Sequence, residues 1–248
     1  MAASVFTICD LHTHTTFSDG RLSPDEVLQA ADAKGYRVGI ADHCGLADGQ
    51  LRDDLQFQAY LEAISRLPVL RSAELDLGAG VGVSPELLAQ CDYLIGGVHS
   101  AGGLDFFDPA APPADGREVV DLMLGVIDRG ARQHRFHVLA HPGLLPMAMR
   151  DRNRQVLDGR WSREVIELAL AHGFALEISS RWELPGAGLI REAQRAGVRF
   201  SLGSDGHSRE RVCQLDYSLA MVAECGLGDG QLLCPALRPT TARTVSAR

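Results

Sequence analysis

The sequence is almost devoid of lysine: of its 24 basic residues only Lys34 is a lysine, and the others are arginines. Because Lys34 falls inside a predicted helix, a metal-dependent amidohydrolase site built on a carbamylated lysine is disfavoured. Basic residues as a whole are also outnumbered, since 32 acidic residues give the chain a net charge of −8. This acidity argues against a broad electrostatic grip on nucleic acid.

Long apolar runs and targeting signals are missing as well. No stretch approaches the ~20 apolar residues that a membrane span needs, and the start, MAASVFTICD, lacks the basic residues of a secretory signal. Cys-x-x-Cys pairs, a Gly-x-Ser-x-Gly motif and a P-loop are absent too. We therefore expect a cytoplasmic protein with no membrane partner and with reduced thiols. The cysteines are Cys9, Cys44, Cys91, Cys213, Cys225 and Cys234.

Short apolar segments alternate with helical patterns along the chain. Strand-like runs are expected at 5–10, 36–41, 69–75, 93–98, 136–140, 174–178 and 198–202, and helices at 23–34, 53–66, a short segment from 84, 117–129, 162–171, 188–196 and 209–224. About seven consecutive βα units predict an α/β fold, with a parallel sheet closed or nearly closed into a TIM-barrel-like barrel. We expect one domain over 1–248, with its core at about 5–225 and an irregular tail at 226–248 whose end is disordered.

Histidines gather at the expected strand ends. Six of the nine histidines lie at or just after the end of a strand-like run, and three acidic residues occupy matching places. The carboxyl ends of barrel strands converge on one face of the barrel, so we expect these nine donors to line one pocket at that face. Carboxylates that lie close together in a small pocket repel one another and lose hydration, which costs free energy unless cations neutralise them. His together with Asp or Glu suits Zn, Mn or Fe as ligands. We therefore expect two or three divalent metal ions on His12, His14, Asp19, His43, Glu74, His99, His141, Asp205 and His207.

Other polar residues have plainer explanations. His134 and His172 lie near predicted helix C-termini, and His137 lies at the opposite end of its strand from His141, so we expect all three to be structural. Asp10 is expected either to orient a ligand imidazole or to cap the loop at the strand end. The alternative for the nine donors is a set of unrelated loop residues, but their placement at successive strand ends argues against it.

The order of these motifs resembles that of a known family. The motifs are Asp10-Leu-His12-Thr-His14, Ser18-Asp19-Gly20, Ala41-Asp42-His43, Ala73-Glu74, Gly97-Val98-His99, Ala140-His141-Pro142 and Gly203-Ser204-Asp205-Gly206-His207. Together they resemble the PHP (polymerase and histidinol phosphatase) family over about residues 8–210. The resemblance implies a distorted seven-stranded (β/α) barrel, a two- or three-metal site and phosphoester hydrolysis, usually of monoesters.

The resemblance also implies which donors share a metal. The first metal would be held by His12, His14, Glu74 and Asp205. Glu74 would bridge to the second metal, which His99 and His141 complete. The third would be held by Asp19, His43 and His207, with Asp19 standing where some members carry a histidine.

The implied reaction is attack of a metal-activated hydroxide on a small anionic phosphate ester. The expected catalytic residues are Asp205, His207 and Arg181, and the planar fork of Arg181 suits phosphate oxygens. Trp182 is expected either to stack on a substrate ring or to pack. The substrate stays open between a phosphorylated metabolite, histidinol phosphate in particular, and a nucleotide or short oligonucleotide. A proofreading exonuclease or a non-catalytic module is a further alternative.

Overall fold

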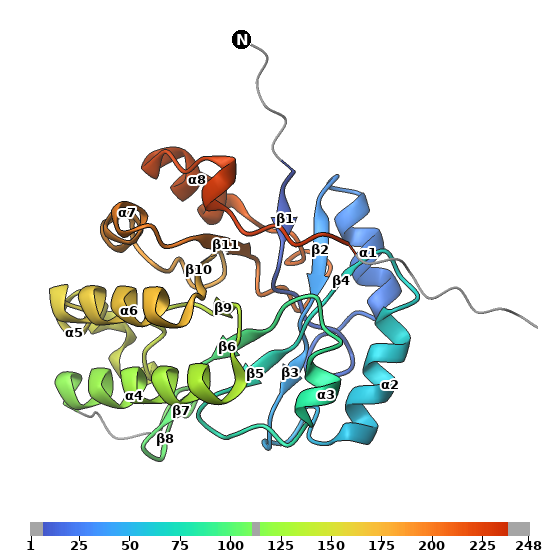
Figure 1. Cartoon of the computed structure of the whole chain (residues 1–248), viewed down its shortest axis with the longest axis horizontal. Helices are drawn as coiled ribbons and strands as arrows, with labels where there is room; N and C mark the ends of the chain where they lie inside the picture. The colour runs from blue at the N-terminus through green and yellow to red at the C-terminus, as the bar shows by residue number, and fades with distance from the viewer. Residues whose placement is uncertain (1–6, 111–114, 238–248) are drawn as a thin grey trace, which may run out of the picture.

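The computed structural model describes residues 7–110 and 115–237. Its strands form parallel sheets with helices packed around them, as the α/β pattern predicts (Figure 1). The strands are β1 (Cys9–Asp10), β2 (Arg37–Ile40), β3 (His43–Cys44), β4 (Leu70–Arg71), β5 (Glu74–Asp76), β6 (Ile95–Gly97), β7 (Ser100–Ala101), β8 (Leu104–Asp105), β9 (Val138–Leu139), β10 (Ala175–Ser179) and β11 (Phe200–Gly203). Residues 5 and 6 of the first expected strand, and the expected disorder at the C-terminal end, lie outside the described residues.

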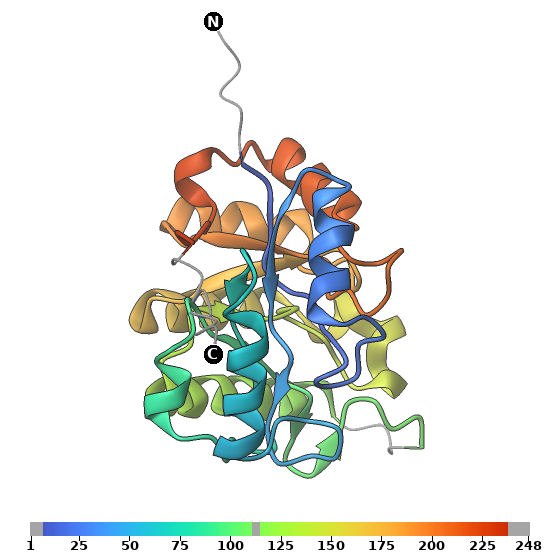
Figure 2. The same cartoon turned by 90° about the vertical axis from the view of Figure 1, so that its right-hand side faces the viewer.

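Helices cover the outside of the strands, and Figure 2 shows α1 to the upper right of β2 and α2 to its lower left. The helices are α1 (Pro24–Asp32), α2 (Asp54–Ile64), α3 (Pro85–Leu88), α4 (Gly116–His134), α5 (Asn153–Val156), α6 (Gly159–His172), α7 (Ala187–Ala196) and α8 (Asp216–Cys225), with 3-10 turns η1 (Met147–Arg152) and η2 (Asp229–Gln231). Helix α1 begins where predicted, because Ser23 and Glu26 form a reciprocal capping box. None of the helices in the described ranges is long and apolar enough to cross a membrane.

The strands of the two larger sheets run parallel and bring their carboxyl ends to the same side. One of these sheets has the order β1-β2-β4 and the other β11-β10-β9-β6-β5-β3, and every ladder in both is parallel, whereas β7 and β8 form a separate antiparallel pair. The N–H of Leu11 donates to the Leu202 carbonyl at 2.9 Å, and the N–H of His14 donates to the Gly206 carbonyl at 3.0 Å. These bonds place the segment after β1 beside β11. Side chains that follow the strands therefore meet on one side of the molecule.

The last helix begins later than predicted. The pattern at 209–224 predicts one helix, but α8 begins at Asp216. Turns fill the preceding residues, where the N–H of Val212 donates to the Ser208 carbonyl and Cys213 has a φ of 59°. The N–H of Cys213 donates to Asp10 Oδ2 at 2.8 Å. This buried contact with a distant residue holds the segment in a non-helical conformation.

The segment after α8 returns to the sheet. Phe200 pairs with Leu232, and the N–H of Leu233 donates to the Phe200 carbonyl at 2.7 Å. The segment thereby brings Cys234 to Cys9, with which it forms a disulfide. The expectation of six reduced thiols is wrong for this pair, because a contact across 225 residues is not visible in the spacing of the cysteines. The other four cysteines form no disulfide within the described residues.

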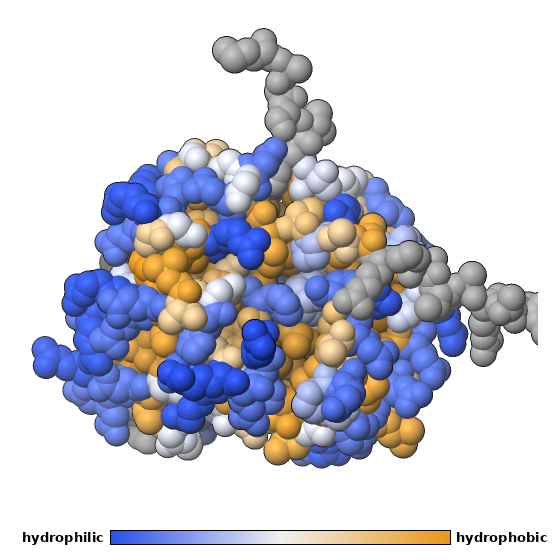
Figure 3. All heavy atoms as spheres, viewed as in Figure 1, coloured by the Kyte–Doolittle hydropathy of each residue, from blue (hydrophilic) through white to orange (hydrophobic). Residues whose placement is uncertain are grey.

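The core consists of apolar side chains from the strands and from the inner faces of the helices. Ile40, Ile95 and Leu176 of the strands are fully buried, and so is Trp161 of α6. Figure 3 shows hydrophilic residues over much of one face, with hydrophobic residues gathered between them. Each Å² of apolar surface that is buried stabilises the folded state by about 25 cal/mol. The packing of these side chains therefore holds the strands, and with them the strand ends, in place.

Candidate metal centre

All nine predicted donors lie on the same side of the sheets, around the carboxylate of Glu74. Glu74 is the first residue of β5 and is 1% exposed. Its two oxygens lie close to the ring nitrogens of five histidines. The distances are 2.9 Å to His43 Nδ1, 3.2 Å to His99 Nε2, 3.2 Å to His141 Nε2, 3.3 Å to His12 Nε2 and 3.7 Å to His14 Nε2. One carboxylate therefore joins donors that are far apart in the sequence.

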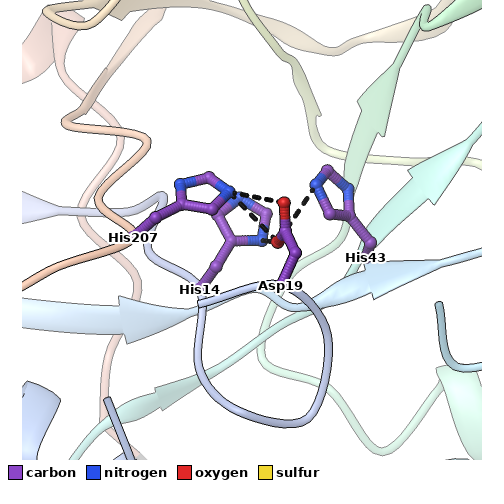
Figure 4. A group of neighbouring side chains, drawn as sticks. All are labelled: His14, Asp19, His43 and His207. Carbon is purple, nitrogen blue, oxygen red and sulfur yellow. Dashed lines mark hydrogen bonds and ion pairs between the residues drawn. The ribbon is translucent and has the colours of Figure 1, made fainter. Parts of the chain in front are cut away.

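Of the remaining donors, Asp19 and His207 lie nearer to solvent, and Figure 4 shows them beside His14 and His43, whereas Asp205 is buried. The side chain of Asp19 is 54% exposed. Its carboxylate lies 3.1 Å from His207 Nε2, 3.6 Å from His43 Nε2 and 3.9 Å from His14 Nδ1. Asp205 Oδ1 lies 3.3 Å from His14 Nε2. Solvent exposure therefore rises across the group, from a buried end at Glu74 to an open end at Asp19.

Burial and close charges displace the pKa values of these groups. Burial by itself raises the pKa of Glu74, but the neighbouring imidazoles, with His99 first, outweigh it and hold that pKa well below its ordinary value. Burial by itself lowers the pKa of His99, yet the carboxylates of Glu74 and Asp76 raise it to about 10. Burial and the neighbouring His43 lower the pKa of His14 to about 3. Glu74 is therefore an ionised carboxylate that requires positive charge close to it.

Several buried ligand atoms of the group have no hydrogen-bond partner within the described residues. They are His12 Nε2, both ring nitrogens of His14, His43 Nδ1 and Glu74 Oε2. Polar atoms left without a partner in a buried position are costly. Three sets of donors have ligand atoms within 4.8 Å of one another: His14, Asp19, His43 and His207; His12, His14 and Glu74; His43, Glu74 and His99. Imidazoles and carboxylates at this spacing fit divalent cations, which would satisfy these atoms.

Asp10 holds the loop that carries the last two donors. Its carboxylate accepts hydrogen bonds from the backbone N–H groups of Ser204 at 2.9 Å, Cys213 at 2.8 Å and His12 at 3.2 Å. Asp10 Oδ2 also accepts a hydrogen bond from the Ser204 hydroxyl at 2.5 Å. None of these hydrogen bonds is to an imidazole, so the contacts favour Asp10 as the cap of the loop around Asp205 over the alternative that it orients a ligand imidazole.

Asp42 likewise holds a loop that carries a candidate donor, and no role was predicted for it from the sequence. Its carboxylate accepts hydrogen bonds from the Thr15 N–H at 2.7 Å and from the Thr15 and Ser18 hydroxyls at 2.6 Å each. Asp42 is fully buried, and it thereby fixes the loop that carries Asp19. The available signal was its place directly before a predicted ligand, His43, at a strand end.

Two donors are held in an uncommon backbone conformation. Asp205 has a φ of 48° and His141 a φ of 29°, both in the left-handed region. A non-glycine residue there costs about 1–3 kcal/mol and persists only where the surroundings impose it. Gly97 leaves the necessary space nearby, because a Cβ atom at this position would lie 2.5 Å from Glu74 Oε1. The surroundings of the site therefore hold Asp205 and His141 in a backbone conformation that non-glycine residues rarely adopt.

A cavity of about 450 Å³ opens in front of the donors. Arg181 lies on its wall, with Nη1 2.6 Å from His207 Nδ1 and 3.4 Å from Asp205 Oδ1. The indole N–H of Trp182 donates to Asp205 Oδ2 at 2.7 Å. Neither of the roles expected for Trp182, stacking on a substrate ring or packing, includes this hydrogen bond. Phe107, 40% exposed, lies beside Trp182 with ring centroids 6.1 Å apart. The cavity is therefore lined by the guanidinium group of Arg181 near the donors and by the aromatic rings of Phe107 and Trp182.

The three histidines expected to be structural lie outside the donor group. The Leu94 N–H donates to His137 Nδ1 at 3.0 Å, and His134 lines the same separate hollow as His137. His172 Nε2 lies 2.8 Å from a carboxylate oxygen of Asp128. None of these contacts involves one of the nine donors, as expected.

One carboxylate beside the group was missed by the sequence analysis. Glu177 of β10 is 1% exposed, and it lies 2.8 Å from His12 Nδ1. Its other oxygen accepts the backbone N–H of His141 at 2.6 Å. The signal was visible, because Glu177 is the one charged residue within the apolar run at 174–178.

Comparison with known proteins defines the family. The PHP domain family matches residues 10–181, so this chain belongs to the PHP domain family, and the resemblance of its motifs is confirmed. DNA polymerase/3'-5' exonuclease PolX of Bacillus subtilis is 26% identical over 82% of this chain. The match covers 35% of that relative, so this chain spans about a third of its length. The "Probable histidinol-phosphatase" of Clostridium acetobutylicum is 22% identical over 89% of this chain and 94% of its own.

A solved structure supports the fold. The crystal structure of a Listeria monocytogenes protein assigned as histidinol phosphatase hisK is similar, with a TM-score of 0.61 at 13% identity. The similarity covers 85% of this chain and 99% of that protein. The α/β architecture described above is therefore shared with it.

Proposed function

We propose that this chain is a metal-dependent phosphoesterase that hydrolyses small phosphomonoesters. The observation that carries the proposal is the convergence of nine His, Asp and Glu side chains, several with unpartnered buried ligand atoms, at one end of a cavity. Membership of the PHP domain family and the names of two similar proteins support it. The chain is thus a hydrolase that acts on phosphate esters.

The nine donors would hold two or three divalent ions of Zn, Mn or Fe. In the division that the family motifs imply, the sets are His12, His14, Glu74 and Asp205; Glu74, His99 and His141; and Asp19, His43 and His207. When bound, such ions lower the pKa of a bound water and neutralise phosphate oxygens. Arg181 offers guanidinium N–H groups to those oxygens from the adjacent wall, and Trp182 orients Asp205. Asp205, His207 and Arg181 thereby form the catalytic side of the cavity.

We infer that the whole chain is one domain whose strands close into a distorted seven-stranded barrel. If β2 with β3 and β4 with β5 are counted as single bent strands, and the β7–β8 hairpin is set apart, seven parallel strands remain. The hydrogen bond between Leu11 and Leu202, which joins the first of them to the last, supports closure. Such a barrel would bring the carboxyl ends of all seven strands to one cup.

The substrate proposed first is a small phosphorylated metabolite or nucleotide. A cavity of about 450 Å³ and a net charge of −8 favour a small molecule over a nucleic-acid strand. Histidinol phosphate is the most specific candidate, since two similar proteins carry that assignment. Exonuclease action on a short oligonucleotide is the second candidate, since the Bacillus subtilis relative is named for it.

Phosphate release from a panel of esters tests the proposal. Protein reloaded with Mn²⁺ or Zn²⁺ is incubated with histidinol phosphate, with nucleoside monophosphates or with a short oligonucleotide, and inorganic phosphate and mononucleotides are measured. We expect phosphate release from at least one small monoester. Mononucleotide release from the oligonucleotide alone would favour the exonuclease instead. Loaded protein that hydrolyses none of these esters would contradict the proposal.

Replacing Arg181 with alanine should mainly raise KM for the substrate. A hydrogen bond to a charged group contributes about 1.5–3 kcal/mol, so we expect a rise of about 10- to 100-fold. Arg181→Lys should recover part of this loss, because it keeps the charge but not the planar fork. Arg195→Ala, an exposed arginine on α7, is the control. A wild-type KM in Arg181→Ala would remove this residue from the substrate site.

A further inference from the structure

Glu177 contacts candidate ligands of two different metals with its two carboxylate oxygens. Oε1 lies 2.8 Å from Nδ1 of His12, and Oε2 accepts the backbone N–H of His141 at 2.6 Å. His12 follows β1 and His141 follows β9, so one side chain of β10 reaches the ends of two other strands, of which only β9 is its direct neighbour. His12 and His141 are both buried, as is Glu177, so these contacts are shielded from bulk solvent.

The contact with Glu177 determines which nitrogen of His12 is free to bind. At 2.8 Å the carboxylate oxygen of Glu177 is placed to accept a hydrogen bond from His12, which assigns the proton to the Nδ1 atom of His12. Nε2 is then left as the ligand atom, and it lies 3.3 Å from Glu74 without a hydrogen bond. A ligand imidazole held in this way keeps its orientation and gains basicity.

The contact with His141 acts on the backbone. His141 has a φ of 29°, which is unfavourable for a residue with a side chain. The charged hydrogen bond from its N–H to Glu177 offsets part of that cost. It thereby keeps the imidazole directed at Glu74, 3.2 Å away.

A glycine in the neighbouring strand makes room for this arrangement. A Cβ atom at Gly203 of β11 would lie 1.8 Å from Glu177 Oε1 and 3.0 Å from His12 Cβ. Gly203 has an ordinary backbone conformation, since it is not among the residues with positive φ in the described chain. The space beside Glu177, rather than backbone freedom, therefore requires glycine at this position.

We propose that Glu177 is a positioning residue that orients His12 and His141 together and so raises the affinity of the two buried metal positions. The inference rests on the proposed function for its metal sites, but not on any particular substrate. Removing such a partner of a ligand typically weakens metal binding about 10- to 100-fold. The residue is expected to act through its two neighbours and to touch neither metal nor substrate.

Zinc affinity measured without turnover tests the proposal. Protein stripped with a chelator is titrated with Zn²⁺ in competition with a chromophoric chelator, for wild type, Glu177→Ala, Glu177→Gln and Ser179→Ala. Ser179 is the matched control, because it lies two residues along the same strand, is equally buried and has no hydrogen bond from its Oγ atom. We expect Glu177→Ala to lose about 10- to 100-fold in affinity at the tighter sites. Ser179→Ala should match wild type.

The glutamine variant keeps the test decisive if the alanine variant does not fold. Glutamine has the same shape but only one acceptor oxygen, so it loses one of the two contacts and should show an intermediate loss of affinity. In the zinc-loaded protein, labelled with ¹⁵N at histidine, exchange of the His12 Nδ1 proton with water should be slow in wild type. It should become faster in the glutamine and alanine variants, which a merely structural role would not produce.

Wild-type zinc affinity in both Glu177 variants would overturn the proposal, and so would an equal loss in Ser179→Ala. Tight zinc binding that depends on Glu177, without phosphate release from any ester, would instead refute the proposed function alone. The two failures are therefore distinguishable.

Discussion

Replacing Glu74 with glutamine should lower kcat/KM for phosphate release by about a thousandfold or more, which corresponds to about 4 kcal/mol of transition-state stabilisation. Glu74 is the only carboxylate in the described chain that lies within 3.7 Å of five ring nitrogens in this group. Glutamine keeps the volume of the side chain but removes the negative charge and one acceptor oxygen. A bridging ligand would thereby be lost, and the activated water with it.

The measurement is steady-state phosphate release together with the metal content of each variant. Glu167→Gln, an exposed glutamate on α6, is the control and should behave as wild type. His99→Ala and Asp205→Ala should also abolish turnover, while circular dichroism shows a retained fold. A Glu74→Gln enzyme with wild-type activity and full metal content would refute the assignment of the centre.

Removing the metals should abolish activity, and Mn²⁺ or Zn²⁺ should restore it. Without cations the centre leaves buried nitrogen and oxygen atoms unpartnered. Three bound divalent ions carry six positive charges, which would take the net charge of the chain from −8 to −2. Ions that bind only the folded state also stabilise it, by about 2.7 kcal/mol at a concentration a hundred times Kd. The melting temperature should therefore rise on reloading, and full activity after exhaustive chelation would contradict the metal mechanism.

Metal loss should proceed from the open end of the centre. The Asp19 side chain is 54% exposed and those of His43 and His207 are 18% exposed, whereas that of Glu74 is 1% exposed. Elemental analysis during graded chelation should therefore show one ion leaving before the others. Asp19→Asn should lose the same ion without chelation and keep those at the buried end. Simultaneous loss of all ions in both experiments would argue against separate sites.

The order of elements was predictable because it depends on local pattern. Apolar runs and capping residues such as Ser23 and Glu26 are read over a few neighbouring positions, and both the strands and α1 follow them. The start of α8 was not predictable in this way. There a buried hydrogen bond from Cys213 to Asp10, across 203 residues, overrides the helical pattern.

The sequence by itself determined which residues are candidate donors, because histidines and acids at the ends of successive parallel strands must meet on one side of the sheet. Tertiary structure alone decided how those donors are held. Apart from the local bond between Asp10 and the His12 N–H, Asp10, Asp42 and Glu177 form these hydrogen bonds with residues 24 to 203 positions away, and Cys9 reaches Cys234 across 225. The physical reason is that a buried carboxylate takes whichever N–H groups the folded chain brings to it, and a single sequence carries no record of those partners.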